Sequence, residues 1–420
     1  MNDGYSEISR RKLFQTVAAA GAGSVLAGCK AKKKRQPTPA PPPQILEPTE
    51  NLPVPKRKLG KTGVEVPCLA LGGNQDLMAN QIVLRNAPVW GVTYWDTAHN
   101  YGESEPGIGK YLAQNPDARK NLFLATKASY AKTAEELEDR LQSSLKNLNT
   151  DYIDLYFGVH ICSDPAQITD ELKHWAENAK RQKRIRFLGV STHQNMPNVL
   201  STAAKLGWID VVMTTYNFRL MQFETLNTAI DACHKAGIGL VAMKTLGSSV
   251  ITQQGRQLVE HFQQRGFGKE QAMVKAILQD ERFTTVCLGM TNIAQLRSGV
   301  AAAQNAADLS HADMKALRQY ADATSTGYCA GCAHICSSAL PQALHPGRIA
   351  DIMRYLMYYN SYSRHDTARD LFAQIPCRVR NRLLDIDYSV AEAHCPQHLP
   401  IAELVAEAVN KLTSPAPTMV

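Results

Sequence analysis

Residues 122–160 read LFLATKASYAKTAEELEDRLQSSLKNLNTDYIDLYFGVH, and this stretch contains the unit that decides the fold. Two short runs rich in apolar, β-branched and aromatic residues, Leu122–Thr126 and Ile153–Val159, are typical of buried strands. Between them, the apolar residues of Thr133–Asn147 recur at three- and four-residue spacing, which predicts an amphipathic helix. A strand, a helix and a second strand in this order predict one unit of a parallel sheet.

The same alternation extends in both directions, from Pro55 to about Met290. The complete set of candidate strands is Leu69–Gly72, Thr93–Asp96, Leu122–Thr126, Ile153–Val159, Arg186–Val190, Val211–Thr214, Gly239–Met243 and Thr284–Leu288. Such a series predicts an α/β protein with a closed (β/α)8 TIM barrel, and an open doubly wound sheet is the alternative. Gly72-Gly73-Asn74, after the first strand, does not match a dinucleotide fingerprint, which favours the barrel. We assign residues 56–310 to the barrel and expect a small hairpin over residues 58–66 to cap its bottom.

Residues 311–412 are predicted to form a separate α-helical, cysteine-rich module. Strand patterns stop there, and helical segments are expected at Gly347–Tyr359, Thr367–Gln374 and Ile401–Leu412. Residues 413–420 are a short tail.

The formal net charge of +8 is concentrated at the start of the chain. Residues 1–58 contain 11 Lys and Arg residues against 4 Asp and Glu residues, whereas the remaining 362 residues contain 35 against 34. A folded body so close to neutral gives no electrostatic reason to bind nucleic acid.

Residues 1–29 have the parts of a secretory signal: Arg10-Arg11, a mild apolar stretch over residues 16–27, and the ending Leu26-Ala27-Gly28-Cys29. They resemble a twin-arginine signal with a bacterial lipobox, which implies export and a lipid anchor on Cys29. Residues 30–55 form a basic and proline-rich linker, whose cations add attraction to anionic headgroups. We expect the chain at the periplasmic or outer face of the cell envelope, anchored to the membrane. A disordered basic tail with an incidental Cys29 is the alternative.

Four polar residues stand where predicted strands run into loops at the C-terminal face of the barrel: Asp96, Tyr101, Lys127 and His160. An ammonium beside a tyrosine favours the phenolate, so we expect Lys127, held by Asp96, to lower the pKa of Tyr101. Such a tyrosine can pass a proton to a carbonyl oxygen, and His160 can hold that oxygen. A structural ion pair and a histidine satisfied at the rim are the alternatives.

The surroundings of these residues resemble the aldo/keto reductase superfamily. The resemblance runs from Arg57 to about Val300 and includes Trp95-Asp96-Thr97-Ala98-His99-Asn100-Tyr101-Gly102-Glu103-Ser104-Glu105, Asp151-Tyr152-Ile153-Asp154-Leu155-Tyr156, Gly189-Val190-Ser191-Thr192-His193 and Ala242-Met243-Lys244-Thr245-Leu246-Gly247. It implies a nicotinamide-dependent oxidoreductase of small carbonyl or alcohol substrates, with Asp96, Tyr101, Lys127 and His160 as the catalytic residues.

The resemblance also implies a set of contacts to NADP(H) or NAD(H). These residues are Ser191, Thr192, His193, Tyr216, Met243, Lys244, Gly289, Met290, Thr291 and Gln295. The usual cations for an adenosine 2′-phosphate are replaced by Gly289 and Gln295, which weakens the attraction for a dianionic phosphate. Arg297 is the nearest substitute.

The late cysteines follow the pattern Cys329-x2-Cys332-x3-Cys336, followed by Cys377 and then Cys395-Pro396. Three thiolates at this spacing suit zinc or an iron–sulfur cluster, and a disulfide framework is the alternative in an exported protein. The region resembles the ferredoxin-like part of iron–sulfur aldo/keto reductases. This implies one 4Fe–4S cluster on Cys329, Cys332, Cys336 and Cys395, with zinc less favoured and Cys377 as an alternative fourth ligand.

We therefore expect an exported, membrane-anchored aldo/keto reductase with a 4Fe–4S cluster and a redox partner. A non-catalytic envelope protein on an inherited barrel and a cluster-based electron-transfer protein are the alternatives.

Overall fold

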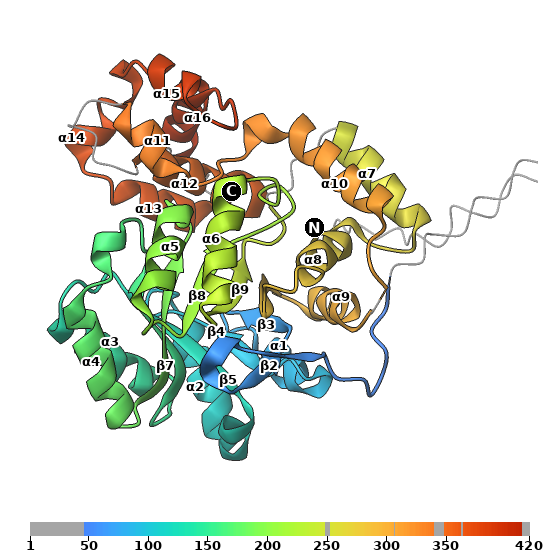
Figure 1. Cartoon of the computed structure of the whole chain (residues 1–420), viewed down its shortest axis with the longest axis vertical. Helices are drawn as coiled ribbons and strands as arrows, with labels where there is room; N and C mark the ends of the chain where they lie inside the picture. The colour runs from blue at the N-terminus through green and yellow to red at the C-terminus, as the bar shows by residue number, and fades with distance from the viewer. Residues whose placement is uncertain (1–45, 248–252, 306, 340–347, 363, 414–420) are drawn as a thin grey trace, which may run out of the picture. The chain divides into compact units, whose positions relative to one another are not determined.

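The structure of this chain is a computed structural model that describes residues 46–247, 253–305, 307–339, 348–362 and 364–413. Eight parallel strands close into a barrel in the order β10-β3-β4-β5-β6-β7-β8-β9 (Figure 1). The strands are β3 (Leu69–Gly72), β4 (Tyr94–Asp96), β5 (Phe123–Ser129), β6 (Ile153–His160), β7 (Ile185–Thr192), β8 (Val211–Thr215), β9 (Gly239–Met243) and β10 (Thr285–Gly289). The predicted (β/α)8 barrel is confirmed, and each strand overlaps one of the eight predicted runs.

Helices surround the barrel on the outside. They are α1 (Gln81–Asn86), α2 (Ser104–Gln114), α3 (Ala134–Asn147), α4 (Asp170–Arg181), α5 (Met196–Leu206), α6 (Glu224–Lys235), α7 (Gln253–Gln264), α8 (Lys269–Leu278) and α9 (Ile293–Gln304). Threonine side chains begin two of them: Thr133 accepts a hydrogen bond from the Glu136 N–H, and Thr169 accepts one from the Leu172 N–H.

The bottom of the barrel is closed by a hairpin of β1 (Lys56–Lys58) and β2 (Glu65–Pro67). Leu59 and Val66 from this region are fully buried and belong to the apolar cluster inside the barrel. Gly60 has a φ of +52°, and a Cβ there would lie 2.3 Å from the Gly237 carbonyl oxygen, so no side chain fits at this contact. The bottom is therefore sealed, and the other end of the barrel carries the loops that hold chemistry.

The C-terminal region is helical, as predicted. Its helices are α10 (His311–Ala323), α11 (Ala333–Ser338), α12 (Arg348–Tyr362), α13 (His365–Ala373), α14 (Cys377–Arg380), α15 (Ser389–Ala393) and α16 (Ile401–Thr413). Helices α12, α13 and α16 share an apolar core of their own, which includes Ile352, Phe372 and Val405. Residues from Pro43 onward nevertheless form one compact unit.

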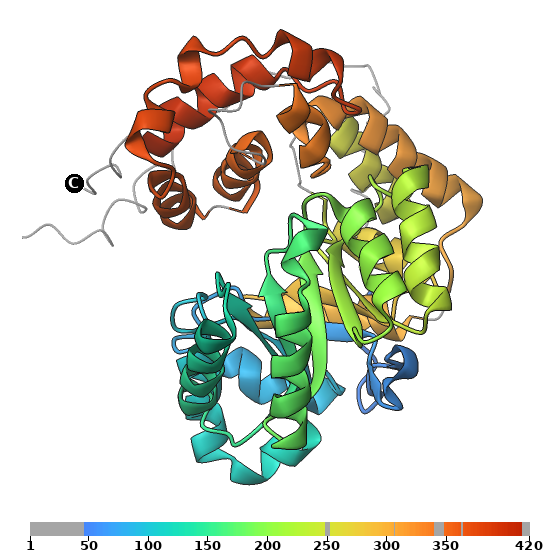
Figure 2. The ribbon, with the colours of Figure 1, turned by 60° about the vertical axis from the view of Figure 1, so that its left-hand side comes forward.

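The orange and red helices of this region lie over the C-terminal ends of the barrel strands (Figure 2). Arg354 in α12 bonds to His193, which follows β7, and Arg364 bonds to Asn74, which follows β3. No helix in the described part of the chain is long and apolar enough to cross a membrane. The predicted signal, Cys29 and the basic part of the linker lie outside the described residues.

Candidate active site

The four predicted catalytic residues meet at the C-terminal face of the barrel. Asp96 is the last residue of β4, His160 is the last residue of β6, and Lys127 lies near the end of β5. Tyr101 is in the loop after β4, and its ring packs edge-to-face on the His160 ring with 6.1 Å between centroids. Because all strands of the barrel are parallel, their C-terminal ends converge and bring these side chains together.

Lys127 and Asp96 form a buried ion pair beneath the mouth. Lys127 Nζ donates to Asp96 Oδ1 at 2.5 Å and to the Thr97 carbonyl oxygen at 2.6 Å. Both side chains are almost inaccessible, at 1% and 4% exposed. Burial raises the pKa of Asp96 above its ordinary value, and the Lys127 charge opposes that rise. Asp96 Oδ2 is buried and has no hydrogen-bond partner among the described residues.

Tyr101 lies above this pair, with Lys127 Nζ 5.1 Å from the centre of its ring. The prediction that Lys127 lowers the pKa of Tyr101 is wrong in direction. Burial raises the pKa of Tyr101 well above 10, and the charge of Asp96 raises it further. The physical reason is that Asp96 offsets part of the ammonium charge, so the attraction of Lys127 does not outweigh the cost of burying a phenolate. At neutral pH Tyr101 is therefore a phenol, which is the form that donates a proton.

His160 is held by two residues that the sequence did not single out, Ser129 and Asn100. Ser129 Oγ donates to Asn100 Oδ1 at 2.6 Å and lies 3.0 Å from His160 Nδ1. Burial, and next the charge of Lys127, hold the pKa of His160 well below 6.5, so the imidazole is neutral. Which of Ser129 Oγ and His160 Nδ1 donates in this contact depends on the tautomer of the neutral ring. A neutral imidazole donates from one of its two nitrogens, so the predicted hydrogen bond from His160 to a carbonyl oxygen stays a prediction.

Several of the residues expected to contact a nucleotide do face the mouth. His193 and Lys244 line a cavity there, and Met243 packs against the apolar cluster inside the barrel. Ser191 is buried in β7. Gly189 faces Phe157 inside the barrel, and Ser191, two residues further along the strand, faces the same way.

Other residues of that set lie elsewhere. Thr192 Oγ1 lies 2.6 Å from the Cys162 carbonyl oxygen and 2.7 Å from the Gln194 carbonyl oxygen, so its one hydroxyl proton is engaged there. Tyr216 stacks on Phe283 outside the barrel interior, and its hydroxyl donates to Asp280 Oδ2 at 2.7 Å. Tyr216 thus supports β8 from outside and does not line the mouth.

The end of β10 and the start of α9 hold the remaining four. Met290 is fully buried, whereas Gly289, Thr291 and Gln295 are exposed or nearly so. Gln295 Oε1 accepts from the Thr291 N–H and lies 3.0 Å from the Thr291 hydroxyl. Arg297, the nearest cation, donates to Glu47 at 3.1 Å, so part of its charge is already balanced.

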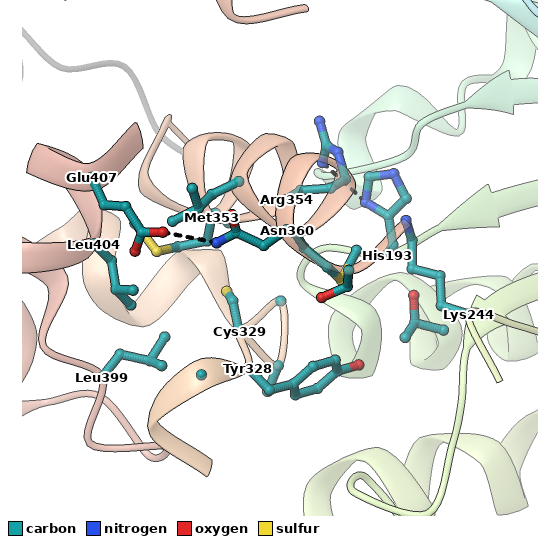
Figure 3. Close-up of a pocket in the computed structure, with 18 residues that line it drawn as sticks. His193, Lys244, Tyr328, Cys329, Met353, Arg354, Asn360, Leu399, Leu404 and Glu407 are labelled. Atoms are coloured by element: carbon teal, nitrogen blue, oxygen red, sulfur yellow. Dashed lines mark hydrogen bonds between the residues drawn. The ribbon is translucent and has the colours of Figure 1, made fainter. Parts of the chain in front are cut away.

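A cavity of about 440 Å³ lies against the mouth, between the barrel and the C-terminal helices. Figure 3 shows His193 and Lys244 on the barrel side, Arg354 on α12, and Leu399, Leu404 and Glu407 on the opposite wall. Thr215, the last residue of β8, also lines it and was missed in the sequence because a lone threonine carries no signal. Its buried Oγ1 has no hydrogen-bond partner among the described residues, which is typical of an atom that meets a ligand.

The late cysteines converge on a second, small cavity. Cys329, Cys332, Cys336 and Cys395 all line it, whereas Cys377 is exposed and is not part of its wall. Burial raises the pKa of the Cys329 and Cys332 thiols to about 12. No disulfide joins any of the nine cysteines that the structure describes. Within the same described ranges, no three His, Cys, Asp or Glu side chains converge tightly enough to hold one metal ion.

The fold and the mouth define a class: an oxidoreductase built on a parallel barrel, with a phenol above an ammonium–carboxylate pair. Residues 70–322 match the family model described as the aldo/keto reductase family, and the chain belongs to this family. The match ends within α10, so α11 to α16 lie beyond it.

Similar proteins agree with this assignment. The aldo-keto reductase yakc [NADP(+)] of Schizosaccharomyces pombe is 31% identical to this chain in an alignment that covers 47% of this chain and 63% of that protein. The L-glyceraldehyde 3-phosphate reductase of Escherichia coli is 24% identical over 59% of this chain and 87% of its own. The holo structure of an aldo-keto reductase from Bacillus halodurans superposes with a TM-score of 0.53 at 22% identity, over 64% of this chain and 96% of its own, which shows a shared fold.

Proposed function

We propose that this chain is an NAD(P)H-dependent reductase of small aldehydes or ketones, with Tyr101 as the proton donor. The observation that carries the proposal is the position of Tyr101 above the buried Lys127–Asp96 pair and against His160. The same residues run the reverse reaction, oxidation of an alcohol, when the phenol accepts the proton.

The residues at the mouth fit a nicotinamide nucleotide. Thr215 Oγ1 and Thr245 Oγ1 are buried with no partner in the described structure, and Lys244 supplies a cation for a phosphate. The space beside Gly289 is open, because no described atom lies within 4 Å of the position that a Cβ would take. Ser191, His193, Thr215 and Lys244 would hold the nucleotide. NADPH differs from NADH by a 2′-phosphate, which a cation would attract. Gly289 and Gln295 carry no charge and Arg297 is paired with Glu47, so these residues support NADH as readily as NADPH.

A nucleotide held by these residues would supply the hydride for the carbonyl carbon. As negative charge develops on the carbonyl oxygen, Tyr101 donates its hydroxyl proton to that oxygen. Lys127 lies close enough to stabilise the phenolate that remains, and Asp96 holds Lys127 in place. His160, whose ring packs against that of Tyr101, can hold the substrate oxygen by a hydrogen bond from its neutral imidazole.

Nucleotide titration followed by protein fluorescence, combined with aldehyde-dependent oxidation of the nucleotide, tests this proposal. Because the pKa of Tyr101 is raised above 10, the protonated phenol persists at lower pH. We expect the maximal rate of carbonyl reduction to stay level between pH 7 and about 10 and to fall only above that range. A protein that binds neither NADPH nor NADH contradicts the proposal.

We also propose that Cys329, Cys332, Cys336 and Cys395 hold a 4Fe–4S cluster. The support is their convergence on one cavity, which Cys377 does not join. A cluster is larger than a single ion, so its thiolates stand further apart than the ligands of zinc. Burial raises the pKa of the Cys329 and Cys332 thiols and so disfavours their thiolates. Metal binding requires the thiolates and therefore acts in the opposite direction on these pKa values.

Two alanine variants distinguish the fourth ligand. We expect anaerobically purified protein to contain iron and sulfide and to absorb near ~400 nm. Cys395→Ala should lose most of the iron, whereas Cys377→Ala, which removes an exposed thiol outside the cavity, should keep it. A colourless, iron-free wild-type protein contradicts the cluster, and loss of iron in Cys377→Ala alone contradicts the ligand set.

The cysteine-lined cavity supports a second candidate function, electron transfer through a cluster with a redox partner. It shares Cys329, Ala330, Ala350 and Leu399 with the larger cavity at the mouth. If electron transfer is the main activity, Tyr101→Phe should leave reduction and reoxidation of the cluster unchanged.

We propose in addition that the chain is exported and anchored through Cys29, on the basis of the residues before the linker. Cell fractionation of wild type and Cys29→Ala tests this, and equal membrane association of the two contradicts anchoring at Cys29.

A further inference from the structure

The C-terminal helices bring two arginines to the mouth of the barrel. Arg354, in α12, lies with its guanidinium 3.2 Å from His193 Nδ1. Arg364, directly before α13, donates to Asn74 Oδ1 at 2.6 Å. Asn74 follows Gly73, whose N–H donates to the Asp96 carbonyl oxygen. Arg354 therefore stands over the end of β7, and Arg364 over the ends of β3 and β4.

Lys244, directly after β9, adds a third positive charge. Its Nζ donates to the Tyr358 hydroxyl of α12 at 3.1 Å and lies 4.8 Å from the centre of that ring. We call Lys244, Arg354 and Arg364 the mouth cations. Arg354 and Arg364 lie beyond residues 70–322, so the region that matches the family model does not contain them.

The mouth cations exceed the negative charge around them. Arg354 donates to Asp351 at 2.8 Å, and that carboxylate also accepts from Gln194. Lys244 and Arg364 bond to a phenol and an amide oxygen, and no ion pair among the described residues involves either of them. The internal segments that the structure leaves undescribed contain no Asp or Glu. Desolvated cations without matching carboxylates are costly, so this arrangement favours an anion.

The titration of neighbouring groups reports the same positive potential. Burial alone would raise the pKa of Tyr358, yet it is lowered, because Lys244 and Arg354 stabilise the phenolate. Burial lowers the pKa of His193 well below 6.5, and Arg354 and Lys244 lower it further. His193 is on the barrel and Tyr358 is on α12. Because the same cations act on both, the electrostatic potential is positive in the space between the barrel and α12.

That space has room and polar groups for a ligand. The cavity of about 440 Å³ is lined by Lys244 and Arg354 and by Thr215, which is 4% exposed and whose Oγ1 has no partner in the described structure. Its size is within the range of small-molecule sites. Glu407 on the opposite wall is paired with Lys411, and Arg364 lies outside this wall, so a hydroxyl and two cations face the cavity and suit carboxylate or phosphate oxygens.

We propose that Lys244, Arg354 and Arg364 bind an anionic group, a carboxylate or a phosphate, at the mouth of the barrel. The proposed function adds the carbonyl end at Tyr101, and on that basis the substrate is a small aldehyde or ketone that carries such a group. The phosphates of the nucleotide have the same chemistry and are the other source of the anion.

Calorimetric titration of the full chain with oxalate and with inorganic pyrophosphate tests the anion site without relying on catalysis. We expect Arg354→Gln and Arg364→Gln to weaken binding of at least one anion by about tenfold to a hundredfold, as for a lost charged hydrogen bond. Arg354→Lys, which keeps the charge, should retain part of the affinity. Arg378→Gln, at an exposed arginine of α14, should match wild type. The proposal is overturned if wild type binds neither anion or if the glutamine variants bind both equally well.

Kinetics with succinic semialdehyde and butanal, which differ in a carboxylate, distinguish the source. A tenfold or larger loss of kcat/KM for succinic semialdehyde only, with unchanged nucleotide affinity, assigns the anion to the substrate. Weaker nucleotide binding with equal losses for both aldehydes assigns it to the nucleotide phosphates. Equal losses with unchanged nucleotide binding overturn the proposal. No turnover of any aldehyde by wild type, together with anion binding lost in the variants, contradicts the proposed reductase and supports the anion site.

Discussion

Tyr101→Phe should lower the kcat of carbonyl reduction by about 10²- to 10⁴-fold, the usual contribution of a positioned general acid. The substitution removes only the hydroxyl and leaves the ring that packs on His160 and lies above Lys127. We therefore expect the affinity for nucleotide and the KM for the aldehyde to change little, because neither depends on proton transfer. Steady-state kinetics and nucleotide titration of the purified variant measure both.

Tyr152→Phe is a matched control for this prediction. Tyr152 is also a phenol against a cation, with the Arg119 guanidinium 3.7 Å from the ring centre, but it lies directly before β6, at the opposite end of the strands from His160. Its removal should leave kcat within about twofold of wild type, as is usual for a substitution away from the chemistry. Retention of full activity by Tyr101→Phe would falsify the role given to Tyr101 and favour a function that does not use the phenol.

Lys127→Met should cost about 3–5 kcal/mol of the free energy of unfolding and abolish carbonyl reduction. The cost arises because Asp96, whose side chain is 4% exposed, keeps its buried carboxylate without the ammonium beside it. Activity is lost because a phenolate at Tyr101 loses the ammonium that lies 5.1 Å from its ring centre, and the charge of Arg364 alone does not replace it. Urea unfolding followed by circular dichroism measures the stability.

The pH dependence of that loss gives a second measurement. Burial raises the pKa of Asp96 even beside Lys127, so in Lys127→Met the folded state binds the proton more tightly than the unfolded state. The stability deficit is then complete above the raised pKa, shrinks as the pH falls through it, and disappears below the unfolded value of about 3.9. A deficit that is the same at pH 4 and pH 8 would show that Asp96 is not its cause.

Two further variants separate stability from catalysis. Lys127→Met combined with Asp96→Asn removes both charges and should regain more than half of the lost stability but none of the activity. Lys180→Met breaks a pair of similar length, 2.6 Å to Asp210, whose lysine is 32% exposed. Because that pair keeps solvent, we expect a loss of about 1 kcal/mol or less.

The positions of the proposed catalytic residues could be predicted from the sequence because strand ends are local features. Asp96, Lys127 and His160 each close an apolar run, and parallel strands bring such ends to one face. The residues that hold these groups could not be found in this way. Ser129 ends β5 and Asn100 lies in the loop after β4, and only the closed barrel places Ser129 beside His160 with Asn100 bonded to Ser129.

The arginines that the C-terminal helices bring to the mouth could not be predicted from the sequence either. Arg354 and Arg364 are about 200 or more residues away in the chain from Tyr101 and Lys127. No pattern in the sequence indicates that α12 lies against His193 and Lys244. The same limit applies to Tyr216, whose side chain faces outward to Phe283 because of the parity of β8.

The sequence by itself determined the barrel, the order of its strands and the three polar residues at or near their ends with Tyr101 in the following loop, because hydrophobic periodicity and chain order are properties of the linear chain. Only the tertiary structure decided the raised pKa of Tyr101, the neutral state of His160 and the excess of cations at the mouth. These depend on burial and on charges brought together from distant segments, and the free energy of a charge is set by its surroundings in space.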